Sequence, residues 1–155
     1  MVKLNVDGSF MEQEGGAGAG MILRDAEGRI VFSACRSLYH CGSVLEAELG
    51  ACMQGTALAL QQTQDPIIVE MNSAVLVKMI LRKNRDISSL GHLVSEVRSL
   101  CCGRQVEFVK IPRFQNKASD ALARFGRVYD TTAVWLGSRP NEILELILGD
   151  CNATV

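Results

Sequence analysis

Three acidic residues stand at the ends of predicted secondary-structure elements. Asp7 closes a strand predicted over residues 2–7, and Glu48 faces outward from the first long helix predicted in the chain. Asp120 lies early in a helix predicted near residues 115–128. Acids at strand and helix ends can converge on one edge of a mixed sheet, and convergent carboxylate oxygens are the ligands that Mg²⁺ requires. The pattern therefore indicates a candidate divalent-metal site.

Each acid alone also has a simpler explanation. Asp7 could form a turn, and Glu48 could belong to a solvated helix face. Asp120 could be favoured by the helix dipole in a first turn. Only the order of the elements around the three acids favours a common site.

The first half of the chain predicts three antiparallel strands. Residues 2–7 alternate apolar and polar side chains before Gly8, which is typical of a strand. A glycine-rich stretch at 14–20 runs into a second strand, and a turn at 25–28 leads to a third over 30–34. Short turns between such runs predict hairpins.

The glycines at positions 15, 16, 18 and 20 also resemble a phosphate-binding loop. No Lys-Ser or Lys-Thr pair follows them, and they lead into a strand rather than a helix. A glycine-lined strand edge is the favoured interpretation.

The second half alternates helices and strands. From Ser43 the apolar residues recur about every 3.6 positions, and Ser43 with Glu46 predicts a capping box for a helix reaching Gln61. Further elements are predicted as strands over 67–70 and 106–110 and helices over 73–80, 88–101 and 115–128. The whole predicts an α/β fold with a five-stranded mixed sheet, three strands antiparallel and two parallel, flanked by helices.

The predicted domain covers residues 1–130, and residues 131–155 form a tail. The tail holds Trp135 and an apolar stretch at 143–148 that predicts a short helix packing on the domain. A contact surface for another protein is the alternative interpretation of this apolar tail.

Composition narrows the class of protein. The 155 residues suit one domain with one core, and 48% hydrophobic with 21% charged residues is typical of a soluble globular protein. A formal charge of −1 argues against a tight non-specific nucleic-acid binder, so a nucleic-acid surface would be a local patch.

The six cysteines show no CxxC spacing, and the chain has only two histidines, which argues against a zinc site. Without a signal peptide, the thiols indicate a reducing, intracellular compartment, nucleus or cytoplasm. No apolar run approaches the roughly 20 residues of a membrane span.

Several stretches together resemble the ribonuclease H family, especially the plant reverse-transcriptase-like ribonuclease H domains. They occur in the family's order and cover nearly the whole chain: residues 4–9, 18–25, 46–49, 69–73, 112–123 and 134–136, with Pro140 and Asp150. The resemblance implies the ribonuclease H-like fold.

The resemblance also implies an activity. The family cleaves the RNA strand of an RNA–DNA hybrid with two Mg²⁺ (or Mn²⁺) ions held by four carboxylates, one ion activating water and the other stabilising the leaving oxygen. Asp7, Glu48 and Asp120 match three of the four catalytic and metal-binding positions, and Asn72 stands at the fourth.

Asn72 keeps a carbonyl oxygen but removes one negative charge beside a divalent cation. At an effective dielectric near 20, one unit-charge pair about 4 Å apart is worth on the order of 4 kcal/mol. Because each 1.36 kcal/mol is tenfold in rate, we expect activity to be weakened or lost. The chain could be a natural pseudoenzyme or carry an engineered Asp-to-Asn change, or Glu70 could supply a carboxylate through water.

The partners implied are an RNA–DNA hybrid or structured RNA. Ser9, Arg113, Asn116 and Lys117 are the candidate substrate-binding residues at the rim of the cleft. A basic cluster could add a contact to the DNA strand or form a solvated turn; it consists of Arg82, Lys83 and Arg85. A non-catalytic nucleic-acid-binding module and a protein-interaction module remain the alternative functions, and the oligomeric state is not determined by the sequence.

A proton carrier is missing from the expected place. Lys110 stands where the plant domains usually carry a histidine, and neither His40 nor His92 is placed to serve the metals.

Overall fold

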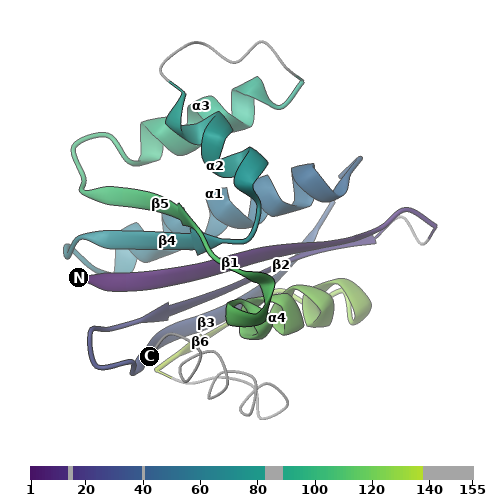
Figure 1. Ribbon diagram of the computed structural model, residues 1–155. Helices are drawn as coiled ribbons and strands as arrows, with labels where there is room; N and C mark the ends of the chain where they lie inside the picture. Colours follow the sequence, from purple (N-terminus) through teal and green to yellow (C-terminus); the bar gives the residue numbers. More distant parts are fainter. Residues whose placement is uncertain (14–15, 40, 83–88, 138–155) are drawn as a thin grey trace.

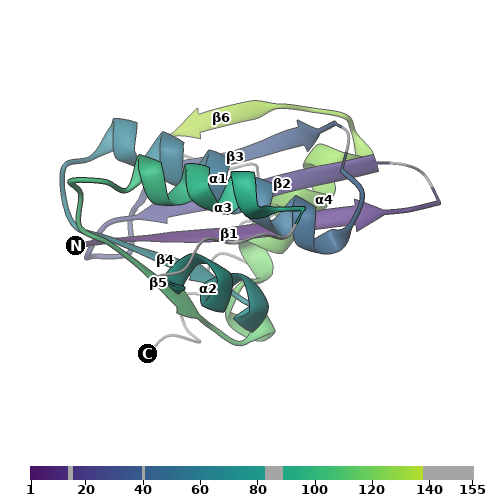
Figure 2. The ribbon, with the colours of Figure 1, turned by 90° about the horizontal axis from the view of Figure 1, so that it is seen from above.

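The computed structural model describes residues 1–13, 16–39, 41–82 and 89–137. Within these residues a six-stranded sheet has the order β5-β4-β1-β2-β3-β6. Figure 1 shows α1, α2 and α3 on one side of the sheet and α4 on the other, and Figure 2 shows α1 and α3 lying over the central strands. This is the mixed sheet flanked by helices that the sequence predicts.

The elements follow the predicted order. The strands are β1 Val2–Met11, β2 Gly16–Arg24, β3 Ile30–Leu38, β4 Ile67–Met71, β5 Val106–Lys110 and β6 Ala133–Leu136. The helices are α1 Val44–Gln62, α2 Ala74–Leu81, α3 Gly91–Leu100 and α4 Lys117–Val128, the last preceded by a 3-10 turn at Arg113–Gln115. The first three strands are antiparallel, while β4 pairs parallel with both β1 and β5.

The prediction of five strands was wrong, because β6 adds a sixth. Residues 133–136 pair antiparallel with β3, with Leu136 opposite Phe32. Four residues are too few to show a period, so the sequence pattern does not reveal this strand. The pairing places Trp135 beside Phe125 of α4 in a small core cluster. The helix predicted over 143–148 lies outside the described residues, and the division at residue 130 stays a prediction.

Helix α1 begins at the predicted cap. The Glu46 amide donates to Ser43 Oγ at 3.1 Å, as in a capping box. The Glu46 carboxylate, however, accepts from the Gly42 amide at 2.7 Å instead of that of Ser43. The hydrogen bond to the Glu46 carboxylate therefore comes from the residue before the cap, and the bond to Ser43 Oγ still caps the start of α1.

The core lies on both faces of the sheet. The larger cluster packs the sheet against α1, α2 and α3 and includes Leu4, Val6, Leu49, Val69 and Leu76. The smaller cluster packs α4 on the opposite face. Helix α4 rests mainly across β2 and β1, so both faces of the central strands are covered.

Two glycines bring helix backbone directly onto the sheet. A Cβ at Gly20 would lie 2.0 Å from the Ser119 carbonyl oxygen of α4, and one at Gly8 would lie 2.4 Å from the Glu48 amide nitrogen of α1. Gly20 belongs to a strand, as expected, but β2 is central in the sheet rather than at its edge. The glycine-rich stretch therefore serves close helix packing.

Adding a methyl group at Gly20 should be costly. We expect Gly20→Ala to lower the free energy of unfolding by about 2 kcal/mol or more, because the helix backbone cannot move aside as a flexible side chain can. Gly16→Ala is the matched control, since its Cβ would meet only the Arg127 side chain, at 3.4 Å. Urea unfolding measures both, and equal midpoints for the two variants would contradict the close contact.

Candidate active site

Asp7 lies at the centre of a group of acids. Its side chain is on β1 and the residue is only 8% exposed. Burial, together with the negative charges of Asp120 and Glu48, raises the pKa of Asp7 to about 7, although the Gly8 amide donates to its Oδ1 at 2.9 Å and opposes the shift. The structure thus brings together the three acids that the sequence singles out.

Glu48 reaches this place because α1 lies directly against Gly8. Burial raises the pKa of Glu48, while a hydrogen bond with Ser73 and the positive charge of Arg113 oppose the shift. Glu48 therefore lies between the start of α2 and the turn before α4.

Asp120 comes from the first turn of α4 and pairs with Arg124 at 3.3 Å. Both residues line a pocket of about 330 Å³ together with Asp7 and Asn72. The exposed side chains of Arg113 and Lys117, two of the predicted substrate-binding residues, line the same pocket. Basic and acidic side chains thus line the same pocket.

Asn72 follows β4 directly and takes its place in this pocket. Its Oδ1 accepts a hydrogen bond from Asn116 Nδ2 at 3.3 Å. The residue predicted to stand at the position of the family's fourth carboxylate is therefore already bound to a neighbour through its oxygen.

Asn116 was predicted to bind substrate at the rim, and the structure buries it at 1% exposure. Its Nδ2 also donates to the Val6 carbonyl at 2.9 Å, and its Oδ1 accepts from Ser119 Oγ at 2.7 Å. Asn116 thus connects β1, the end of β4 and the start of α4, and its substrate role stays a prediction.

Asn5 is a residue of the site that no predicted motif includes. This buried residue donates from Nδ2 to Asn116 Oδ1 and to Glu70 Oε1, both at 3.2 Å. Its position two residues before Asp7, on the same face of a predicted strand, is the signal that could have found it.

The Glu70 carboxylate is bound to two residues of β1. It accepts from Asn5 and lies 3.9 Å from Lys3 Nζ. These contacts give no support to the idea that Glu70 replaces the missing carboxylate through water.

Other predicted residues lie elsewhere. Ser9 does not line the pocket, and its Oγ accepts from Arg127 Nε at 2.9 Å. Lys110 is exposed at the end of β5 and His92 is exposed on α3. His40, Lys83 and Arg85 lie outside the described residues.

The side chains of Asp7, Glu48 and Asp120 are the candidate ligands for a divalent cation. Three hard carboxylate oxygens that repel one another suit Mg²⁺ by their chemistry. Yet no three His, Cys, Asp or Glu side chains of the described residues form a group that could hold a metal ion. Asp7, Glu48 and Asp120 are therefore close enough for their charges to interact and fit a cation by chemistry, although they form no ready-made metal-binding group, and Asn72 adds no charge.

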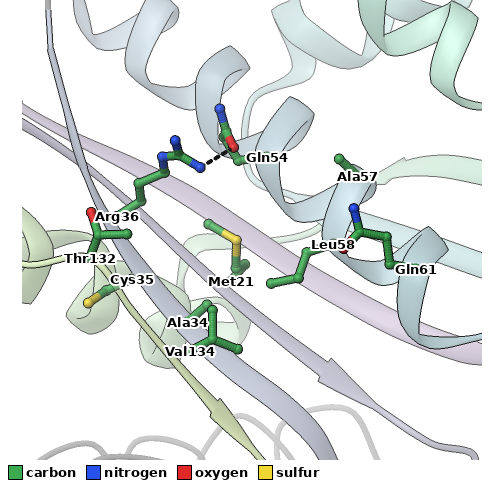
Figure 3. A pocket seen from close by; sticks show the side chains of 10 residues that line it. All are labelled: Met21, Ala34, Cys35, Arg36, Gln54, Ala57, Leu58, Gln61, Thr132 and Val134. Atoms are coloured by element: carbon green, nitrogen blue, oxygen red, sulfur yellow. Dashed lines mark hydrogen bonds between the residues drawn. The ribbon is translucent and has the colours of Figure 1, made fainter.

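A second pocket lies between α1 and the strands β3 and β6. Figure 3 shows Met21, Leu58 and Val134 lining it, with Arg36 donating to Gln54 Oε1 at 2.6 Å. Among the residues that the structure describes, no carboxylate lines this pocket. It therefore lacks the convergent acids of the first.

The rings of Trp135 and Phe125 pack edge to face, with their centroids 6.5 Å apart. This contact shows the residue packing on its own domain. It gives no support to a protein-binding role for Trp135.

Residues 5–126 match the family model described as reverse transcriptase-like. The chain belongs to this family. The plant origin suggested by the resemblance stays a prediction, and no curated protein matches the chain by sequence.

Solved structures show the fold of this reverse transcriptase-like domain. Ribonuclease H1 from the archaeon Halobacterium salinarum superposes with a TM-score of 0.74 at 22% identity, covering 84% of this chain and 98% of that one. LC11 ribonuclease H1, solved with an RNA/DNA hybrid, has a TM-score of 0.74 at 20% identity and covers 84% and 99%. The domain therefore has the ribonuclease H-like α/β fold. None of its described helices is long and apolar enough to cross a membrane.

The acids should make stability depend on pH. The pKa of Asp7 rises on folding from 3.8 to about 7, so the folded state holds a proton that the unfolded chain has released. The free energy of unfolding should therefore fall as the pH rises from about 4 to 7, by on the order of a few kcal/mol. Urea unfolding in EDTA across this range measures the slope.

Asp7→Asn should remove most of that slope and stabilise the metal-free protein near pH 8. Asp65→Asn, at an exposed position before β4, is the control and should leave the slope unchanged. A slope that survives in Asp7→Asn would show that Asp7 is not the buried acid responsible.

Proposed function

We propose that this domain binds RNA–DNA hybrids in the pocket of Asp7 and Asp120, and that it cleaves the RNA strand only weakly. One observation carries the proposal: Asp7, Glu48 and Asp120 converge from three elements, while the fourth place beside them is an amide, Asn72.

Basic residues around the acids support a nucleic-acid partner. Arg113, Lys117 and Arg124 line the same pocket, and most protein contacts to nucleic acids go to the phosphate backbone. With a formal charge of −1 for the chain, attraction would be confined to this patch.

Proteins of similar fold that were solved with bound nucleic acid also support a nucleic-acid partner. The LC11 enzyme was solved with an RNA/DNA hybrid, and a foamy viral protease–reverse transcriptase was solved with double-stranded DNA. These complexes are those proteins' own, and they make a hybrid the first substrate to test here.

Asp7, Glu48 and Asp120 are the residues that would hold a divalent ion. A bound ion would supply charge stabilisation and an activated water for phosphodiester hydrolysis. Position 72 contributes no negative charge, and a lost unit-charge pair on the order of 4 kcal/mol accounts for weak cleavage.

A non-catalytic hybrid-binding role is the second candidate. It is favoured by the hydrogen bond that occupies the Asn72 oxygen and by the lack of a metal-binding group among the described residues. Binding through Arg113 and Lys117 needs no metal, so this function survives if hydrolysis is absent.

We also propose an intracellular setting, which the free thiols support. Cys35, Cys41, Cys52, Cys101 and Cys102 form no disulfide with one another. Residues 1–130 are proposed as the domain, with the segment that follows as a tail, although β6 joins the sheet.

Restoring the fourth carboxylate should restore cleavage. We expect Asn72→Asp to raise the rate on a labelled RNA–DNA hybrid in Mg²⁺ or Mn²⁺ by about two orders of magnitude or more, because the added charge stabilises a bound cation. Gel analysis of the cleaved RNA strand measures the rate, and Asn72→Asp combined with Asp7→Asn is the inactive control.

The outcomes separate the two candidate functions. Comparable cleavage by the unaltered chain would show that the lost charge has been overrated. Binding by both proteins without cleavage would establish the non-catalytic role. Absence of hybrid binding in fluorescence anisotropy would reject both functions.

A further inference from the structure

The side chain of Asn72 ends a row of buried hydrogen bonds that runs from Glu70 through Asn5 and Asn116. Glu70, Asn5 and Asn116 are all less than 9% exposed. An ionised carboxylate only accepts hydrogen bonds, whereas an amide side chain has one accepting end and one donating end. Which end of each amide donates and which accepts is therefore determined by its neighbours along the row.

The Glu70 end sets the direction of Asn5. Because Glu70 accepts, Asn5 must present its NH₂ group, and the same Nδ2 donates to Asn116 Oδ1 at 3.2 Å. Arg24 Nη1 lies 3.5 Å from Asn5 Oδ1, which places a donor at the opposite end of that amide. Asn5 is thus oriented by a partner at each end.

Asn116 is oriented twice over. Its oxygen faces two donors, Asn5 Nδ2 and Ser119 Oγ. Its Nδ2 faces the Val6 carbonyl at 2.9 Å, and a backbone carbonyl can only accept. If the Asn116 amide were reversed, its NH₂ group would face the NH₂ group of Asn5, and its oxygen would face the Val6 carbonyl oxygen. The NH₂ group of Asn116 must therefore face Asn72.

Asn72 must then offer its oxygen to Asn116, leaving the NH₂ group at its other end. In the part of the chain that the structure describes, Asn72 Nδ2 has no hydrogen-bond partner, while the residue lines the pocket shared with Arg113 and Lys117. The fourth position of the acid group therefore presents a hydrogen-bond donor.

We infer that Asn72 binds a non-bridging phosphodiester oxygen of the nucleic acid through Nδ2, so that the cleft binds its hybrid without a divalent metal. This inference rests on the proposed function, since it names the contact by which the hybrid is held. An NH₂ donor on a residue that lines the pocket suits an anion and disfavours a cation. Arg113 and Lys117 supply positive charge beside it.

The direct test observes the Asn72 NH₂ group itself. In ¹H–¹⁵N correlation spectra of the unaltered protein in EDTA, we expect the Asn72 side-chain resonances to shift as an RNA–DNA hybrid is added. The shift should follow the binding curve from fluorescence anisotropy. The NH₂ resonances of Asn5 serve as the internal control and should stay in place, because this group is bonded inside the protein to Glu70 and Asn116 and not to Asn72.

Variants give a second readout. Asn72→Ala should weaken hybrid binding in EDTA roughly tenfold, the effect of losing a hydrogen bond to a charged group. Asn72→Asp should bind weakly in EDTA and recover in Mg²⁺, because a carboxylate repels phosphate until a cation intervenes. Gln64→Ala removes an exposed amide after α1 and should leave binding unchanged.

Failure of the inference differs from failure of the proposed function. Saturable hybrid binding in EDTA with unmoved Asn72 resonances, or with full affinity in Asn72→Ala, would overturn the inference and leave hybrid binding standing. If no hybrid binds, the proposed function fails and inorganic phosphate becomes the probe. A phosphate-dependent shift of the Asn72 resonances would then show that Asn72 Nδ2 binds a phosphate oxygen although the cleft binds no hybrid, and the absence of a shift would reject the phosphate contact as well.

Discussion

The close contact between helix backbone and sheet at Gly8 and Gly20 determines the geometry of the site. On one face α1 lies against β1 at Gly8, and on the other α4 lies against β2 at Gly20. A side chain at either position would hold its helix away from the sheet. Asp7 would then lose Glu48 on one side and Asp120 on the other, so the acid group exists because these two positions carry no side chain.

Bringing acids together in this way has a cost. Burial and like charge oppose ionisation of Asp7, which is why its pKa rises. A fourth carboxylate at position 72 would add to this repulsion unless a cation offset it. Asn72 avoids the added charge and bonds to Asn116 instead. Asn72, which under the proposed function lowers the rate of hydrolysis, therefore also avoids a source of repulsion in the metal-free protein.

The hydrogen-bonded amide side chains of Asn5, Asn116 and Asn72 hold the elements of the site in position. Asn116 holds the start of α4 against β1 and reaches the end of β4, so it fixes where Asp120 and Asn72 lie relative to Asp7. Because buried polar groups are costly when unpaired, these hydrogen bonds stabilise one arrangement of the three elements. The nucleic-acid contacts would then come from exposed residues such as Arg113 and Lys117 at the surface of the pocket.

The local sequence determined the elements and the acids at their ends. The alternation before Asp7, the helical period after Ser43 and the breaks between them are properties of neighbouring residues, and they suffice to predict an α/β fold and a common edge for Asp7, Glu48 and Asp120. Only the tertiary structure decided the sixth strand, because four residues show no period, and the orientation of Asn72. That orientation depends on the hydrogen bonds of Asn5 with Glu70 and with Asn116, whose partners are 65 and 111 positions apart in the sequence. No local sequence pattern carries information about contacts between residues so far apart.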